Sequence, residues 1–542
     1  MIGRTNSAGV MPVGTINITE NGTYSISSFS QAIVSVSGLV PSGTLEISSN
    51  GIYDVTSYAG ASVNVQGGGG SEAYEWIDVV LGGTSDIYSG YCPSIIRSRA
   101  MQEFVSLTAF VPTFSSNWSH IVVGQNAFNN DQQLAMVNFL SSSCTKTISY
   151  GAFSNCMRLS GDVLNINSIQ DYAFYGCKSL GMVTFVGSSV NIPMSAFAGN
   201  NNNNRASASA FTFSCDILFM ANGVFAFNDC SIYNFDGVRQ LSLGDMAFAS
   251  CSIQSFIHSS VYASANWQGS FYLRYGTFMS CSSLSIVSMS AYNNQGSTNL
   301  YLAFCTNCFT NCSNLEEINI QPKNFSSWTH ISVGQSAFYG CLALKSFPFE
   351  LLSSCYSGAF AYAGIYSIRN STKGVWASST FQGCSRLRFV ELTTKLYFYP
   401  SVFMNCSALS FVRFIDGPWT GQTDTLIGNS IFKNCISLKS MLFSDHVTFY
   451  SLAFQGCTQL ESIYLLGSSL ASDYYGNFLS DTPIINSTYL GYYGSIYVPE
   501  SLYSSYIAAT NWVAYSERFV SVTDAEKEQL ITDYYNVSYI EE

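Results

Sequence analysis

Three cysteines have the close spacing that a zinc site often uses, namely Cys305, Cys308 and Cys312. No histidine lies nearby, and Cys308 and Cys312 also fill regular positions of the repeat described below, so we expect no metal site. We find no nucleophile elbow, no zinc-hydrolase helix and no carboxylate pair in a recognisable setting. The sequence therefore predicts a protein that is not an enzyme and that uses no cofactor.

Two Trp-His pairs are the remaining candidates for chemistry. Trp118 and His120 stand in a segment that is duplicated later in the chain, where Trp328 and His330 take the same places. Such a pair could stack on a sugar ring and bind a glycan. The alternative is that both pairs pack at loops, which is the commoner use of these residues.

The chain that must position these residues is built from an internal repeat, Phe-x-x-Cys-x-x-Leu-x-x-φ-x-φ, where φ is apolar. Phe309, Cys312, Leu315, Ile318 and Ile320 show it most clearly. A period of roughly 20–30 residues is typical of solenoids. We identify fourteen turns, of which eight are full copies, three are shortened and three are degraded. The other turn phenylalanines are Phe128, Phe153, Phe174, Phe197, Phe227, Phe248, Phe278, Phe338, Phe360, Phe381, Phe403, Phe432 and Phe454.

The spacing within one repeat predicts its local structure. Residues three apart face the same side of a tight 3₁₀-like turn, so Phe, Cys and Leu share one face. The final spacing of two is that of a short strand with one buried face. One unit cannot bury these side chains alone, so the units must stack. The fold class that follows is a repeat solenoid, mostly β and loop, with short parallel strands and tight 3₁₀ turns.

The cysteines fit this repeat rather than a disulfide framework. The chain has 17 of them, an odd number, and eleven occupy the turn position as small buried apolar residues. We expect free thiols and folding in a reducing cytosol.

The repeat resembles a known family. The run from Val333 to Phe338, Val-Gly-Gln-Ser-Ala-Phe, matches the start of the BspA-type leucine-rich repeat in its (I/V)-G-x-x-A-F-x-x-C-x-x-L form. The resemblance covers about residues 121–522. It implies a right-handed, curved leucine-rich-repeat array with a parallel sheet on one face.

The region before the repeats holds a smaller duplication. Residues 14–38 and 43–66 each contain alternating apolar residues around an Asn-Gly turn, at Asn21 and at Asn50, which predicts small antiparallel β-hairpin modules. These modules resemble short β modules of structural and tail proteins of phages that infect Gram-positive bacteria. The resemblance implies docking to other virion proteins through residues 1–66.

Composition shifts divide the rest of the chain. The Gly-rich run is a flexible linker, and a Pro followed by helical spacing predicts a short helix in the terminal unit. The expected parts are two hairpin modules at 1–66, a linker at 67–71, an N-terminal β cap at 72–120, the repeats at 121–494, a C-terminal cap at 495–522 and an acidic tail at 523–542.

Charge and hydropathy argue against two classes of partner, namely nucleic acid and the membrane interior. Only 10% of the residues are charged and the net charge is −12, which argues against nucleic acid, since phosphate binding needs clustered Lys and Arg. No apolar run is long enough for a membrane span, so we expect no membrane insertion. The start of the chain lacks the apolar region of a secretory signal, so we expect no secretion signal.

These observations leave three functional hypotheses. The first is a phage virion protein of the tail or fibre type, made in the host cytoplasm, whose solenoid binds a bacterial surface glycan or protein; as a fibre it would be a homo-oligomer. The second is a BspA-like adhesin, secreted or on a bacterial surface, that binds host proteins. The third is a structural spacer. Exposed strand positions would line the binding face, namely Ser288, Asn319, Glu391 and Tyr464.

Overall fold

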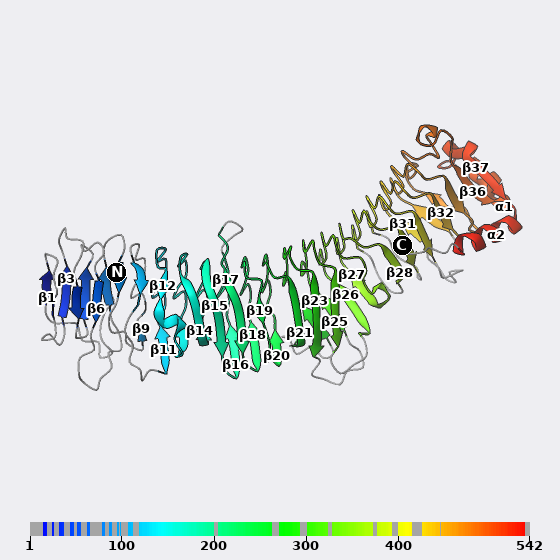
Figure 1. Ribbon diagram of the computed structural model, residues 1–542. Helices are drawn as coiled ribbons and strands as arrows, with labels where there is room; N and C mark the ends of the chain where they lie inside the picture. Colours follow the sequence, from blue (N-terminus) through cyan, green and yellow to red (C-terminus); the bar gives the residue numbers. More distant parts are fainter. Residues whose placement is uncertain are drawn as a thin grey trace. The chain divides into compact units, whose positions relative to one another are not determined.

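Figure 1 shows the computed structural model of the chain. The structure describes residue 98, residues 107–111, 119–199, 204–262, 270–292, 301–322, 328–371, 377–392, 399–414, 425–444 and 446–536, and the strands that precede residue 107. The chain forms two compact units. Unit 1 comprises residues 1–254 and 258–264, and unit 2 comprises residues 255–257 and 265–542.

Most described coils contribute one strand before the Phe-Cys-Leu turn and one strand after it. In unit 2, β24 (Tyr301–Phe304) precedes the turn of Phe309 and β25 (Glu317–Pro322) follows it. β24 pairs in parallel with β22 and β26, whereas β25 pairs in parallel with β23. The coils therefore stack into parallel ladders of pre-turn and post-turn strands, which we call the pre-turn and post-turn sheets (Figure 1). At β14 and β21 a ladder of one kind continues into a ladder of the other. This confirms the predicted repeat solenoid.

The strands and 3₁₀ helix up to β21 are short. They are β1 (Thr15–Ile18), β2 (Tyr24–Ser25), β3 (Ala32–Val36), β4 (Thr44–Ile47), β5 (Gly51–Val55), β6 (Ser62–Val65), β7 (Asp78–Leu81), β8 (Asp86–Tyr88), β9 (Ile95–Ile96), β10 (Leu107–Phe110), β11 (His120–Val123), β12 (Met136–Val137), η1 (Asn138–Ser141), β13 (Thr145–Ile148), β14 (Ser160–Ile169), β15 (Ser179–Val186), β16 (Ser189–Ile192), β17 (Ala208–Ser214), β18 (Ile217–Met220), β19 (Tyr233–Asn234), β20 (Gln240–Ser242) and β21 (Ser255–Tyr262).

The remaining elements add two α-helices near the end of unit 2. They are β22 (Ser270–Leu273), β23 (Ile286–Tyr292), β24, β25, β26 (His330–Val333), η2 (Phe349–Leu351), β27 (Leu352–Cys355), β28 (Ser367–Ser371), β29 (Phe389–Leu392), β30 (Phe411–Phe414), β31 (Thr425–Ile427), β32 (Ser440–Phe443), β33 (Val447–Phe449), β34 (Ser462–Leu465), β35 (Ser472–Asp473), η3 (Ser487–Tyr489), β36 (Ser495–Pro499), α1 (Glu500–Ala508), η4 (Val513–Arg518), β37 (Phe519–Val522) and α2 (Asp524–Tyr535).

The strands of residues 15–65 correct the hairpin prediction. β1, β3, β5 and β7 form one parallel ladder, and β2, β4, β6 and β8 form part of another. Consecutive strands such as β4 and β5 thus lie in different sheets, so the predicted antiparallel pairing is wrong. Alternating apolar residues show that a strand has one buried face, but they do not reveal whether it pairs with its neighbour in sequence or with the next coil.

A stack of phenylalanine rings forms the centre of each unit. Every turn Phe ring lies nearly parallel to the ring of the next coil, with centroids 5.0–5.9 Å apart and planes within 23°. Offset stacking of this kind adds to the gain from burial. The rings are Phe128, Phe153, Phe174, Phe197, Phe225 and Phe248 in unit 1, and Phe278, Phe309, Phe338, Phe360, Phe381, Phe403, Phe432 and Phe454 in unit 2.

The turn cysteine links each coil to the one before it. Its thiol donates a hydrogen bond to the carbonyl oxygen of the preceding turn Phe, as Cys341 does to Phe309 at 3.1 Å. Nine such bonds have Sγ to O distances of 2.7–3.2 Å. Burial raises the pKa of the Cys384 thiol to about 12. The turn cysteine is therefore a small apolar residue that also carries a donor, and the sixteen described cysteines are all free thiols.

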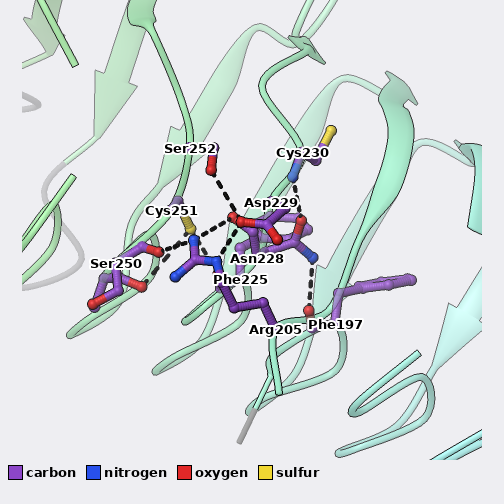
Figure 2. A network of polar contacts seen from close by, with 10 residues as sticks. Phe197, Arg205, Phe225, Asn228, Asp229, Cys230, Ser250, Cys251 and Ser252 are labelled. Carbon is purple, nitrogen blue, oxygen red and sulfur yellow. Dashed lines mark hydrogen bonds and ion pairs between the residues drawn. The ribbon is translucent and has the colours of Figure 1, made fainter. Parts of the chain in front are cut away.

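The turn at residues 225–230 corrects one assignment of the repeat. Phe225, not Phe227, stacks between Phe197 and Phe248. Three residues later Asn228 takes the cysteine position, and its Nδ2 donates to the carbonyl of Phe197 at 2.8 Å (Figure 2). An amide thus replaces the thiol as donor. The sequence pattern placed the turn two residues late because Phe227 and Cys230 happen to have the same spacing.

Arg205 fastens this part of unit 1 from outside. Its guanidinium donates to the carboxylate of Asp229 and to the carbonyls of Asn228 and Ser250, which belong to two successive turns (Figure 2). Asp229 also accepts a hydrogen bond from Ser252 at 3.1 Å. All these partners belong to the protein itself, so the network is a structural clamp.

Replacing one ring of the stack should lower the stability of the protein against unfolding. Phe338 contacts rings on both sides, so Phe338→Ala should lower the free energy of unfolding by about 3–5 kcal/mol. Leu342→Ala is the control, since Leu342 is 56% exposed, and should change stability by about 0.5 kcal/mol or less. Urea unfolding followed by circular dichroism measures both; equal effects would contradict the stack as the core.

At the cysteine position, a side chain that donates a hydrogen bond should give a more stable protein than a side chain that has no donor. Asn228→Ala removes the donor to Phe197 and the acceptor of the Cys230 N–H, and should cost about 1–3 kcal/mol per unsatisfied group. Asn228→Cys restores the donor used in the other coils and should cost less. Urea unfolding compares the two variants, and an equal loss would show that the hydrogen bond to Phe197 contributes nothing.

Candidate functional site

The first Trp-His pair is only partly described, since Trp118 lies outside the described residues. His120 begins β11 on the pre-turn sheet of unit 1 and is half-buried. Its Nδ1 lies 2.8 Å from the hydroxyl of Thr145, and its Nε2 lies 3.1 Å from that of Thr147. Both ring nitrogens thus have threonine partners on β13, and the ring is held on the sheet.

The second pair separates in the structure. Trp328 is only 6% exposed, and its indole N–H donates to the carbonyl of Ile320 at 2.6 Å. This placement favours the packing alternative for Trp328. His330 instead stacks on Tyr301 of the preceding pre-turn strand, with ring centroids 4.7 Å apart and planes 18° apart. Tyr301 is 40% exposed, so Tyr301 and His330 form a surface aromatic pair that the sequence pattern did not reveal.

Ser288 and Asn319 lie side by side on the outer face of a post-turn sheet. They are register partners on β23 and β25, and their neighbours Val287, Met289 and Ile320 point into the core. Asn319 is exposed and accepts a hydrogen bond from Gln321 at 2.9 Å. The period-2 prediction of which residues face outward is therefore right for this pair, and an open polar strip results.

Glu391 lies on the same kind of face but is covered. It is 5% exposed and forms an ion pair with Arg413, whose Nε donates to Oε2 at 2.7 Å. Arg413 in turn donates to the carbonyl of Tyr535 at 2.8 Å. The carboxylate of Glu391 is thus occupied inside the protein, which does not fit its predicted place on an open binding face.

Helix α2, which contains the Tyr535 that Arg413 contacts, also covers Tyr464. Its ring stacks on Tyr497 at 4.7 Å, and both pack against a cluster that includes Tyr534 and Leu530 of α2. The buried members of this cluster are Phe389, Phe411, Leu442, Leu466, Val522 and Tyr534. Burial also raises the pKa of Tyr464.

Helix α2 therefore closes the outer face of the last post-turn strands. A capping box starts it: Thr523 accepts from the Glu526 N–H, and Glu526 accepts from the Thr523 N–H at 2.8 Å. Tyr534 fixes its far end by donating to the carbonyl of Val412 at 2.6 Å. The sequence predicted only an acidic tail here, because most of the residues that α2 covers lie between about 60 and more than 100 residues earlier in the chain.

Exposed tyrosines recur on unit 2 just before the turns. They stand three to five residues ahead of the phenylalanine or leucine that begins the turn. Tyr450 and Tyr474 lie in successive coils and stack at 5.8 Å with planes 7° apart. The exposed members are Tyr275, Tyr356, Tyr399, Tyr474 and Tyr475. Their recurrence relative to the turns is visible in the sequence, but the Trp-His pairs do not include these tyrosines.

The described residues offer little for metal chemistry. Among them, no group of three or more His, Cys, Asp or Glu side chains is placed to hold a metal ion. Burial raises the pKa of Cys308 and of Cys312, which disfavours the thiolate form that binds metals. Lys146 is fully buried on β13, but its ammonium donates to the carbonyls of Ser142, Cys144 and Leu164 at 2.6–2.9 Å. Burial lowers its pKa to about 8.

The family follows from the repeat itself. Six copies of the BspA type leucine rich repeat region match residues 94–222, 303–418 and 419–490, which is more than half of the chain. The chain belongs to the BspA-type leucine-rich repeat family. The matched regions begin earlier than the predicted start of the repeats at residue 121. Neither helix in the described part of this BspA-type protein is long and apolar enough to span a bilayer.

Solved leucine-rich repeat structures are similar to this BspA-type chain. One from Bacteroides ovatus is 18% identical, with 80% of this chain and 92% of that chain covered and a TM-score of 0.35. A leucine-rich cell surface protein from Faecalibacterium prausnitzii is 16% identical, with 87% and 89% covered and a TM-score of 0.21. The pneumococcal vaccine antigen PcpA is 13% identical, with 67% and 88% covered and a TM-score of 0.29. No curated protein is significantly similar in sequence.

Removing the main anchor of α2 should uncover the sheet beneath it. Tyr534→Ala loses a buried ring and the hydrogen bond to Val412, so it should lower the free energy of unfolding by about 3–5 kcal/mol if α2 unfolds with the rest. If α2 detaches alone, binding of the dye ANS should rise instead. Glu528→Ala on the exposed side of α2 is the control. Unchanged stability together with unchanged dye binding would contradict the covering role of α2.

Proposed function

We propose that this protein is a non-catalytic recognition protein of the adhesin type, which works at a cell surface or as a secreted protein. Its solenoid binds a glycan or a protein of another surface through many weak aromatic and polar contacts. The observation that carries this proposal is the recurrence of exposed tyrosines at the same place on several coils of unit 2, as at Tyr356, Tyr399 and Tyr474.

A repeated aromatic surface suits the recognition of extended partners. Tyrosine offers a large apolar face and a hydroxyl, and ordering it on binding costs little conformational entropy. Regular spacing of coils also lets one chain contact several equivalent units of a partner, which raises the overall affinity without any single strong contact. The scarcity of charge fits a partner recognised by stacking and hydrogen bonds rather than by ion pairs.

A phage virion protein of the tail or fibre type is the second candidate. Its support is the resemblance of residues 14–66 to short modules of phage structural proteins. The strands of that region continue the parallel ladders of the solenoid, so this candidate retains only its sequence motif as support. In either setting the solenoid would be the part that binds.

Binding to whole cells tests the recognition role. Fluorescently labelled full-length protein should bind some members of a panel of Gram-positive bacteria and epithelial cells. A triple variant, Tyr275→Ser, Tyr356→Ser and Tyr399→Ser, should weaken binding about tenfold or more through lost aromatic contacts. Leu342→Ser, Ile436→Ser and Val513→Ser form the matched control, which removes exposed aliphatic side chains instead.

The outcome separates the candidates. Binding that the tyrosine variant loses and the aliphatic control keeps would support recognition through the tyrosines, whereas no binding to any cell by well-folded protein would favour a structural spacer. Antibody labelling of intact source cells would place the protein on a cell surface. Detection in purified phage particles, without surface labelling, would instead favour the virion role.

A further inference from the structure

The coil at residues 470–476 breaks a rule that the other described coils keep. The last residue of a pre-turn strand, or Leu243 just after β20, points into the core, and the register places Ile427, Phe449 and Asp473 at this position in neighbouring coils. Asp473 is only 2% exposed. The equivalent residues elsewhere are buried and carry hydrocarbon or thiol side chains: Val123, Ile148, Ile169, Ile192, Met220, Leu273, Phe304, Val333 and Cys355.

The carboxylate of Asp473 is only half satisfied. Its Oδ1 accepts hydrogen bonds from the backbone N–H groups of Gly476 at 2.9 Å and Tyr475 at 3.3 Å. Its Oδ2 is buried and has no hydrogen-bond partner. Burial raises the pKa of Asp473. A buried acceptor without a donor destabilises the fold, so folding alone does not explain the second carboxylate oxygen of Asp473.

Asp473 lines an open pocket of about 420 Å³ between β35 and the segment that follows α1. Tyr474, Asn511 and Trp512 also line it. The indole N–H of Trp512 donates to the carbonyl of Ala471, and the amide of Asn511 donates to the carbonyl of Asp473 at 2.5 Å. These bonds hold the two walls together, so the pocket is built by the fold rather than by a loose loop.

An aromatic platform stands at the rim of this pocket. Tyr474 is 67% exposed, and its ring lies flat against that of Tyr450 and beside that of Tyr475. The two bonds to Asp473 Oδ1 fix the backbone that carries these rings. A sugar ring has an apolar C–H face that packs on such a platform and hydroxyl groups that can donate to a carboxyl oxygen.

We propose that this pocket is a carbohydrate subsite that takes one neutral sugar unit, with its C–H face on Tyr474 and a hydroxyl donating to Asp473 Oδ2. The inference rests on the proposed recognition function and names the ligand class and one place where it binds. A cation is the less suitable occupant, because the pocket walls supply aromatic rings and an amide rather than further carboxylates. Asn511 is exposed at the wall, where its amide carbonyl can accept from a second hydroxyl.

Saturation-transfer NMR on the full-length protein tests the subsite. The probes are N-acetylglucosamine, lactose, maltose and the protonated amine glucosamine. At least one neutral sugar should receive magnetisation from the protein, and Tyr474→Ala should weaken its binding about tenfold or more. Asp473→Asn keeps the acceptor for the Tyr475 and Gly476 N–H groups but places an amide where Oδ2 stood, and should also weaken binding. Tyr150→Ala, which removes an exposed tyrosine of unit 1 that has no assigned role in binding, is the control.

Each outcome decides the inference. Loss of sugar binding in both pocket variants, with binding kept in the control and unchanged circular dichroism, would support it. No binding of any neutral sugar, equal binding by Tyr474→Ala and wild type, or binding of glucosamine alone would overturn it. Cell binding measured in parallel separates the two proposals: cell binding that persists without sugar binding leaves recognition standing and removes only the subsite.

Discussion

The stacked phenylalanine rings are the interaction on which the rest of the structure depends. A single coil cannot bury its turn phenylalanine, because the faces of that ring pack against the rings of the two neighbouring coils. Phe338, for example, stacks between Phe309 and Phe360. The thiol that donates to the preceding Phe carbonyl adds a polar link between the same two coils. Stability therefore arises between coils, and each coil is held by the two beside it.

This dependence makes the ends of the array a physical problem, and unit 2 shows how one end is closed. Trp512, Tyr515 and Phe519 bury apolar surface after the last turn, and Tyr506 of α1 packs with them. Helix α2 then covers the outer face of the last post-turn strands. Closing the array in this way leaves the turns, the tyrosines before them and the uncovered sheet faces as surfaces for function. It also creates the pocket of Asp473 where the cap meets the last coil.

The repeat made the core predictable, and local spacing explains why. Phe309, Cys312 and Leu315 are buried on one face of a tight turn, as the spacing of three predicts. The turn makes the expected i to i+3 hydrogen bonds, from the Cys312 N–H to Phe309 and from the Leu315 N–H to Cys312. Such features depend only on residues close in sequence. The double role of the cysteine was not predicted, because its acceptor lies in the previous coil.

The features that the sequence pattern missed depend on distant contacts. The cover over Glu391 and Tyr464 comes from α2, which follows them by more than a hundred and by about sixty residues respectively, and nothing near either residue announces it. Trp328 is the exception for its hydrogen bond, since Ile320 lies only eight residues earlier, but its ring also lies 6.4 Å from that of Phe271 on β22. The two-residue shift at Phe225 arose because two phenylalanines competed for one position. The unusual position of Asp473 follows only from the strand register, which pairs it with the buried Phe449 of the preceding coil.

Hydrogen exchange of the backbone amides that join one coil to the next is the most direct test of this account. The turn amides of Phe309, Phe338 and Phe360 donate to carbonyls of the following coil at 2.7–2.8 Å, beside the ring stack. If the stack holds the coils together, these amides should be among the slowest to exchange and should exchange together, at the rate of global unfolding. Turn amides that exchange quickly and independently, while strand amides remain protected, would contradict the central role of the phenylalanine stack.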